Sequence, residues 1–267
     1  EVTGVVLFDD VANVTLRGFT LSVSNRVPGV DRALVIRGTD ETAVIENCII
    51  HGTQYGIKVH SPATIRNNSL FGGGEQGIYI GNMPTAAVIL NNIITGYRRG
   101  IHVVAGTASP TPSLSYNNSW DNDEDYANYP DQSGRDGNIS VDPEFESVDP
   151  LWLSLHLRST SPCVDGGDPD SDWSREPPPN GSRINMGAYG NTPEATESLM
   201  TVTATPFEEW LASGDAAEFT GDGVMALFGG AGGSTNRQPT RSEGSECDNS
   251  HLSRVESDLG RRTARTA

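Results

Sequence analysis

The residues best suited to chemistry in this sequence are a cation, a phenol and an imidazole at one position of a recurring motif. The motif reads Gly-Ile-x-Val or Gly-Ile-x-Ile, and its variable position holds Lys58, Tyr79 and His102 in successive copies. Successive residues of a strand point to opposite faces, so the variable residue points away from its apolar neighbours. Stacked copies predict one outward column of Val35, Lys58, Tyr79 and His102 and a neighbouring column of Arg37, His60, Gly81 and Val104.

These columns could bind a glycan or act on one. Lys58, the only lysine in the chain, or His102 could remove a proton next to a sugar carboxylate. Arg37 could neutralise that carboxylate, Tyr79 could stack on a sugar ring, and His60 lies beside them. The same residues also fit a solvated sheet face, which must carry some polar side chains. The columns hold no pair of carboxylates, so hydrolysis by two acids has little support.

A second motif indicates the architecture that positions these columns. Its copies alternate apolar and polar residues before asparagine, at residues 44–50, 64–70, 88–94 and 114–120. An earlier copy at residues 14–21 has Gly18 where the others have the first asparagine. With this copy included, the repeats follow one another at intervals of 20 to 29 residues, a period typical of solenoids. This period is too short for a strand followed by a crossover helix, so each repeat is predicted to hold two or three short strands.

The four copies also predict a column of asparagines that hydrogen-bond from coil to coil. With the copies aligned, the column consists of Asn47, Asn67, Asn91 and Asn117. Such ladders stabilise stacked parallel strands. Asparagine also marks surface turns, but four copies in one register favour the ladder. On another face, Glu46 and Arg66 are predicted to form an ion pair between coils.

With these motifs, residues 1–120 resemble the right-handed parallel β-helix repeat family. The resemblance implies an all-β, right-handed parallel β-helix in which acidic polysaccharides bind cationic and aromatic strips on one face. Two functions fit. The first is a secreted or cell-surface scaffold that binds carbohydrate. The second is a pectate-lyase-like polysaccharide lyase acting on acidic glycans, which needs a base and a cation on adjacent coils. The sequence contains no recognisable catalytic motif of a lyase, so the function as a carbohydrate-binding scaffold is favoured.

Residues 140–195 carry a different pattern, with Asp-Pro-x-Phe at 142–145, Ser-Pro-x-x-Asp-x-Gly at 161–167 and Gly-Ala-Tyr at 187–189. This order resembles the terminal segment of secreted bacterial β-helix proteins often labelled choice-of-anchor Q. Cys163, usually Ala there, and Gly190, often Glu, depart from the pattern. A solenoid end exposes apolar edges, so residues 121–195 are predicted to be a last irregular coil and a cap. The side chains predicted to pack over the open end are Phe145, Leu155, Leu157, Ile184, Met186 and Tyr189.

The net charge and the composition restrict which classes of partner this protein can have. The net charge of −17, most of it in residues 121–176, argues against nucleic acid, which needs clustered Lys and Arg. No apolar run approaches the length of a membrane span. The expected partner is a polysaccharide. The protein is expected to be a monomer. Calcium is the one cofactor considered, because it prefers several oxygen ligands. Its candidate ligands are Asp121, Asp123 and Asp125, with a second group at Asp165, Asp168, Asp170 and Asp172; a solvated acidic loop is the alternative.

The remaining signals concern cysteines, the tail and location. Cys48, Cys163 and Cys247 show no disulfide or zinc spacing, and Cys48 replaces an asparagine inside a repeat, where a small buried residue is expected. Residues 196–267 are predicted to be a short helix at 205–214 followed by a mostly disordered, low-complexity tail. The chain begins at Glu1 inside a repeat-like strand, so we expect a fragment of an extracellular or cell-surface protein.

Overall fold

A computed structural model describes most of the first 199 residues and two short strands beyond them. The described residues are 6–10, 13–22, 32–38, 43–81, 87–104, 111–149 and 153–199, together with the backbone of 2–3, 217–219 and 225–227. The chain divides into two compact units, Glu1–Thr201 and Val202–Ala267. The described part contains strands and turns, and no α-helix occurs within it.

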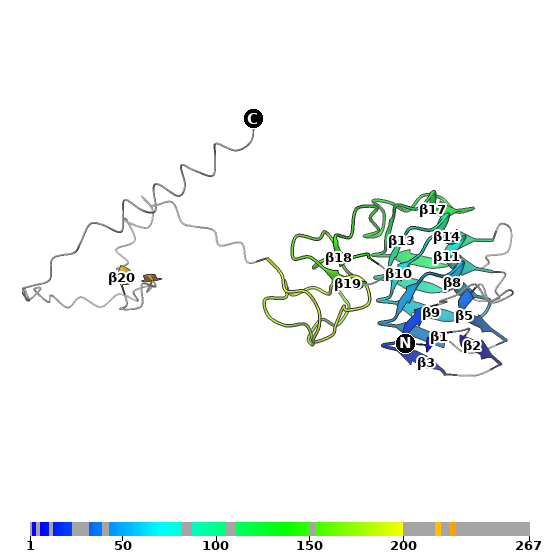
Figure 1. Ribbon diagram of the computed structural model, residues 1–267, viewed down its shortest axis with the longest axis horizontal. Helices are drawn as coiled ribbons and strands as arrows, with labels where there is room; N and C mark the ends of the chain where they lie inside the picture. Colours follow the sequence, from blue (N-terminus) through cyan, green and yellow to red (C-terminus); the bar gives the residue numbers. More distant parts are fainter. Residues whose placement is uncertain are drawn as a thin grey trace, which may run out of the picture. The chain divides into compact units, whose positions relative to one another are not determined.

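The first unit is a stack of coils whose strands form three parallel sheets (Figure 1). Sheet 1 contains β1 (Val2–Thr3), β4 (Thr20–Ser22), β7 (Ile49–His51), β10 (Ser69–Phe71), β13 (Ile93–Thr95) and β16 (Asn118–Trp120). Sheet 2 contains β2 (Val6–Asp9), β5 (Arg32–Arg37), β8 (Tyr55–Val59), β11 (Gln76–Ile80), β14 (Arg99–Val103) and β17 (Glu124–Ala127). Sheet 3 contains β3 (Thr15–Arg17), β6 (Ala43–Glu46), β9 (Ala63–Arg66), β12 (Val88–Leu90) and β15 (Ser113–Ser115). The parallel β-helix predicted from the repeats is therefore confirmed.

The core consists of apolar side chains that point into the coils. These side chains form columns from coil to coil, at least one on each sheet. They include Ile45, Ile65 and Ile89 from sheet 3, Ile50, Leu70 and Ile94 from sheet 1, and Ile57, Ile78 and Ile101 from sheet 2, all fully buried. Burying one such side chain stabilises the fold by about 1.5–3 kcal/mol. The repeated apolar position of each motif is thus what holds the coils together.

The glycine of the Gly-Ile-x-Val motif has a steric role. A Cβ at Gly77 would collide with the side chain of Ile94 in sheet 1 and with the backbone of Gly100 in the next coil. Sheets 1 and 2 therefore approach each other closely at this point, and only glycine fits. After the glycine the chain points Ile78 inward and Tyr79 outward, which sets the outer face of sheet 2.

The asparagine ladder forms one position further along the chain than the aligned motifs predict. In the structure Ile89 pairs with Leu114, which moves Asn117 out of the predicted column with Asn91. In the fourth copy Tyr116 takes the turn position of Asn91, and Asn117 takes the ladder position of Asn92. That copy thus has one residue more before its first asparagine than the alignment assumed. The column that does form contains Cys48, Asn68, Asn92, Asn117 and Asn138.

Each ladder amide satisfies buried backbone groups as well as its neighbours. Asn92 Nδ2 lies 2.8 Å from Ile65 O, 3.0 Å from Leu90 O and 3.0 Å from Asn117 Oδ1. Asn92 Oδ1 accepts a hydrogen bond of 3.0 Å from the backbone N of Asn68. Cys48 is fully buried, as expected, and its Sγ donates to backbone carbonyls at 3.3 and 3.7 Å, so the thiol takes the place of a ladder amide.

The other asparagine column turns the chain between sheets 3 and 1. Asn47, Asn67 and Asn91 have φ values of 53°, 50° and 57°, and Gly18 occupies the same position in an earlier coil with φ 73°. Asparagine and glycine are the residues that adopt this left-handed conformation most readily. The backbone therefore bends at these positions, and the three amides are left at the edge of the coils.

The region predicted as a cap lies against the side of the stack instead of over its end. We call residues 142–199 the cover segment; it includes the antiparallel strands β18 (Phe145–Ser147) and β19 (Ser154–Leu157), beside β10 and β13 in Figure 1. Five of its buried side chains form a second apolar cluster with Ile93, and Ile49 and Phe71 pack against that cluster. These three residues face outward from sheet 1, and covering them explains why the segment docks laterally.

Hydrogen bonds from the turn asparagines and sheet 1 hold the cover segment in place. Asn47 Nδ2 donates to Ala188 O at 3.0 Å and to Gly190 O at 2.8 Å. The backbone N of Gly187 donates to Asn91 O at 2.8 Å, and that of Ala188 donates to Ser69 Oγ at 2.9 Å. The docking thus uses the backbone around the Gly-Ala-Tyr motif.

The end of the stack is occupied by a shorter stretch of chain. Asn138 Nδ2 donates to Leu114 O at 2.8 Å, and Ile139 forms a parallel bridge with Asn118. Tyr129 packs against the main core. Residues 128–141 therefore continue the ladder and close the last coil, inside the region that the sequence assigns to a last irregular coil.

The second unit is described only by an antiparallel pair, β20 (Ala217–Phe219) and β21 (Met225–Leu227). The helix predicted at 205–214 and Cys247 lie outside the described residues, as does the rest of the tail that is predicted to be mostly disordered. Cys48 and Cys163 are free and buried. Within the described part of the chain no helix is long and apolar enough to cross a membrane.

Candidate functional site

The outward column predicted from the Gly-Ile-x-Val motif lies on the outer face of sheet 2. Tyr79 pairs with Lys58 on one side and His102 on the other, and Lys58 pairs with Val35. His60 follows β8 in the neighbouring column, where its backbone N donates to Ile36 O at 2.8 Å. The predicted placement is confirmed, whereas the binding role of these residues stays a prediction.

The side chains of this face contact one another across coils. Lys58 Nζ lies 3.6 Å from the centre of the Tyr55 ring and 5.5 Å from that of Tyr79, distances at which a cation is attracted to an aromatic face. The Tyr79 ring lies 5.4 Å from His60, tilted by 54°, and 5.5 Å from His102, edge to face at 78°. Tyr79 is therefore the centre of one continuous set of rings.

His102 is held between two side-chain amides. Its Nδ1 lies 2.8 Å from the amide of Gln76, and its Nε2 lies 2.9 Å from that of Asn128. Both contacts are made by amide nitrogens, Gln76 Nε2 and Asn128 Nδ2. A neutral imidazole has one N–H and one lone pair, so the lone pair of the ring accepts a hydrogen bond from one of these two NH2 groups. With both nitrogens engaged, His102 is oriented as part of a surface, and acting as a base would require breaking one of these bonds.

The pKa values of both histidines of this face are lowered, which favours the neutral imidazole. Burial lowers the pKa of His60, with the positive charges of Lys58, Arg37 and Arg32 adding to the effect. Burial and Arg99 also lower the pKa of His102, against a smaller opposing effect of Glu124. At neutral pH the centre of this face therefore carries uncharged rings.

We expect His60 and His102 to titrate in NMR below about 6.5, the ordinary value for histidine. A folded pKa below the unfolded one means that each group contributes stability above the unfolded pKa. This contribution is lost as the pH falls through the folded pKa. The control is the chain unfolded in urea. Midpoints in the folded protein at or above those of the unfolded chain would contradict the expected direction.

Arg37 has a partner that the sequence analysis missed. Its Nε and Nη2 donate to the two carboxylate oxygens of Asp9 at 3.0 and 2.9 Å, across paired strands β2 and β5. Both side chains are about half exposed. Side chains alternate between the two faces of a strand at residues 6–9, so the sequence could have predicted that Asp9 lies on the same outer face as Arg37. A sugar carboxylate would have to displace Asp9 before Arg37 could bind it.

The acidic candidates do not converge on a point. Asp125 accepts hydrogen bonds from Asn122 at 2.8 Å and from Ser140 at 2.7 Å, so both its oxygens are engaged within the last coil. In the second candidate group, Asp168 and Asp172 each accept bonds from nearby backbone and side-chain groups. Among the described residues no group of three His, Cys, Asp or Glu is placed to hold a metal ion. Calcium binding at Asp121, Asp123 and Asp125 stays a prediction.

The ion pair predicted on sheet 3 forms and has a third member. Glu46, with its side chain 5% exposed, binds Arg66 at 2.7 Å and Arg17 at 2.6 Å, from the coils on either side. Clefts in the described structure lie near this triad and the cover segment. The column of outward side chains on sheet 2 runs from coil to coil, a direction along which a polymer could lie.

Comparison with known proteins supports the architecture. Residues 3–129 match the family model described as the right handed beta helix region. No curated protein and no solved structure matches the chain. The match covers the coils and ends before the cover segment.

Proposed function

We propose that this protein is a secreted or cell-surface β-helix scaffold that binds a carbohydrate chain on the outer face of sheet 2. The observation that carries the proposal is the continuous set of rings around Tyr79, flanked by Lys58 and by the amides of Gln76 and Asn128. Extracellular location is supported by the resemblance of residues 140–195 to terminal segments of secreted bacterial proteins.

The chemistry of this face matches that of a glycan. Sugar rings present apolar C–H faces that pack on aromatic rings, and hydroxyls that both donate and accept hydrogen bonds. Coils are spaced by about 4.8 Å, so the face from β8 to β17 extends over about 14 Å, long enough for several sugar units. The net charge of −17 and the neutral histidines favour a neutral glycan over an acidic one.

A polysaccharide lyase acting on acidic glycans is the alternative. It would use Lys58 or His102 as the base and Arg37 as the neutralising cation. The pairing of Arg37 with Asp9 and the two amides on His102 give this alternative less support than binding. Unsaturated products, detected by ultraviolet absorbance with pectate, alginate or glycosaminoglycans as substrates, would establish it in place of the scaffold.

Replacing Tyr79 by alanine is expected to weaken binding of a neutral oligosaccharide about tenfold or more. Removing roughly 60 Å² of apolar ring surface from water contributes about 1.5 kcal/mol, and about 1.4 kcal/mol corresponds to a factor of ten. The measurement is calorimetric titration with a panel of neutral and acidic oligosaccharides. Tyr79→Phe is the matched control, because it keeps the ring and should retain most of the affinity. Equal affinity of wild type and Tyr79→Ala for every glycan, or no binding at all, would reduce this face to a solvated sheet surface.

A further inference from the structure

A cleft lies where the cover segment meets the turns between sheets 3 and 1, away from the face described above. Its volume is about 470 Å³, and Arg17, Phe19 and Asn47 line one wall while Arg175 and Tyr189 line the other. A second cavity of about 370 Å³ shares Arg17, Asn47 and Arg175 with it. Both volumes lie in the range of small-molecule sites, which often form between two structural elements.

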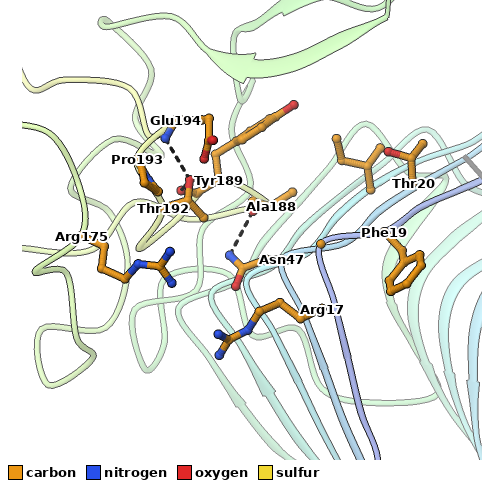
Figure 2. Close-up of a pocket in the computed structure, with 12 residues that line it drawn as sticks. Arg17, Phe19, Thr20, Asn47, Arg175, Ala188, Tyr189, Thr192, Pro193 and Glu194 are labelled. Carbon is orange, nitrogen blue, oxygen red and sulfur yellow. Dashed lines mark hydrogen bonds between the residues drawn. The ribbon is translucent and has the colours of Figure 1, made fainter.

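Two arginines of opposite walls are directed into the same opening (Figure 2). Arg17 is held in place by Glu46, to which its Nε donates at 2.7 Å. Arg175 is placed by its backbone N, which donates to Asn191 Oδ1 at 3.1 Å. The Arg175 guanidinium forms no hydrogen bond or ion pair with any residue that the structure describes. A guanidinium with open donors beside a second, immobilised guanidinium is an arrangement that binds a carboxylate.

The rest of the cleft suits a hydroxyl-bearing ring. Asn47 Nδ2 donates to the cover segment. Asn47 Oδ1 points toward the opening between the two arginines, where it can accept a hydrogen bond from a ligand (Figure 2). Phe19 is 44% exposed at the rim and offers an apolar ring face. Glu194 lies beside Tyr189, on the side of the cleft away from the guanidinium groups (Figure 2). Glu194 is thus the carboxylate on the far side of this cleft, whereas Glu46, which binds Arg17, and Asp170 and Asp172 line the adjoining cavity. The charge of Arg175 acts on Asp172, so a ligand carboxylate would compete with that residue.

We infer that this cleft is a binding site for a single acidic sugar, a monosaccharide that carries a carboxylate. Its carboxylate lies between Arg17 and Arg175, a hydroxyl donates to Asn47 Oδ1, and its ring packs on Phe19. The site is separate from the face around Tyr79 and does not depend on the function proposed for that face. It forms only when the cover segment is docked, because the second arginine belongs to that segment.

The test is calorimetric titration of the full chain with glucuronate, glucose and acetate at low ionic strength. We expect glucuronate to bind about tenfold or more tightly than either of the others, because only glucuronate has both the charge and the ring. Arg175→Ala should weaken glucuronate binding about tenfold or more, as expected for loss of a charged hydrogen bond. Added salt should weaken binding to wild type, since exposed charges are screened.

Two control variants make the outcome interpretable. Arg158 is also an exposed arginine of the cover segment but does not line the cleft, so Arg158→Ala should leave glucuronate affinity unchanged. Tyr79→Ala should also leave it unchanged, which separates this site from the face of sheet 2. Equal binding of glucuronate by wild type and Arg175→Ala would overturn the assignment. Equal binding of acetate and glucuronate, or no saturable binding of glucuronate by wild type, would overturn it as well.

Discussion

Replacing Asn92 by alanine is expected to lower the free energy of unfolding by about 2–4 kcal/mol. The Asn92 side chain is fully buried and lies within hydrogen-bonding distance of Ile65 O, Leu90 O and Asn117 Oδ1, while it accepts from the backbone N of Asn68. Alanine leaves the Asn68 N–H and the Ile65 carbonyl buried without this partner. Each buried polar group so orphaned costs about 1–3 kcal/mol. Urea unfolding followed by circular dichroism measures the loss.

Cys48→Ala is the matched control for this variant. Cys48 occupies the same column, is equally buried, and makes only long thiol contacts of 3.3 and 3.7 Å to carbonyl oxygens. A thiol is a weak donor, so the loss should be about 1 kcal/mol or less, below the about 2–4 kcal/mol expected for Asn92→Ala. If both alanine variants lost the same stability, burial alone would account for the effect and the ladder bonds would contribute nothing.

The triple variant Asn47→Gly, Asn67→Gly, Asn91→Gly is expected to undock the cover segment and leave the coils folded. Glycine adopts the left-handed conformation of these turns without strain, as Gly18 does in the same position. The variant removes the donors to Ala188 O, Gly190 O and Asn185 O and the acceptor of the Asp168 N–H. At about 0.5–1.5 kcal/mol for each bond, the docking loses roughly 2–6 kcal/mol.

Hydrogen exchange measured by mass spectrometry distinguishes undocking from unfolding. Amides of residues 160–190 should exchange faster in the triple variant, while peptides that contain the ladder at Asn92 keep the protection of wild type. Asn13→Gly is the control, because Asn13 also has a positive φ of 54° and is exposed, away from the cover segment. Unchanged exchange in residues 160–190 would show that the apolar cluster alone holds the segment.

Much of the coil architecture follows from local patterns in the sequence. The strand period, the repeat length and the glycine of each motif are properties of short segments, and they predicted the stack and the outward column of Lys58, Tyr79 and His102. The ion pair of Glu46 and Arg66 was predictable for the same reason, since register follows from the repeats. The ladder was misplaced by one residue because Leu114 fits either of two apolar positions of the motif, and only the pairing with Ile89 decides between them.

The lateral docking of the cover segment is what only the tertiary structure decided. Ile49 and Phe71 are apolar residues at outward positions of sheet 1, and such residues indicate that another part of the chain covers this sheet. The sequence did not say which stretch of chain provides that cover, because an irregular segment has no period from which its path follows. The meeting of Arg17 and Arg175 depends entirely on that path. Repeats determine their own neighbours through regular hydrogen bonding, whereas a loop-rich segment is placed by side-chain contacts between residues far apart in the chain.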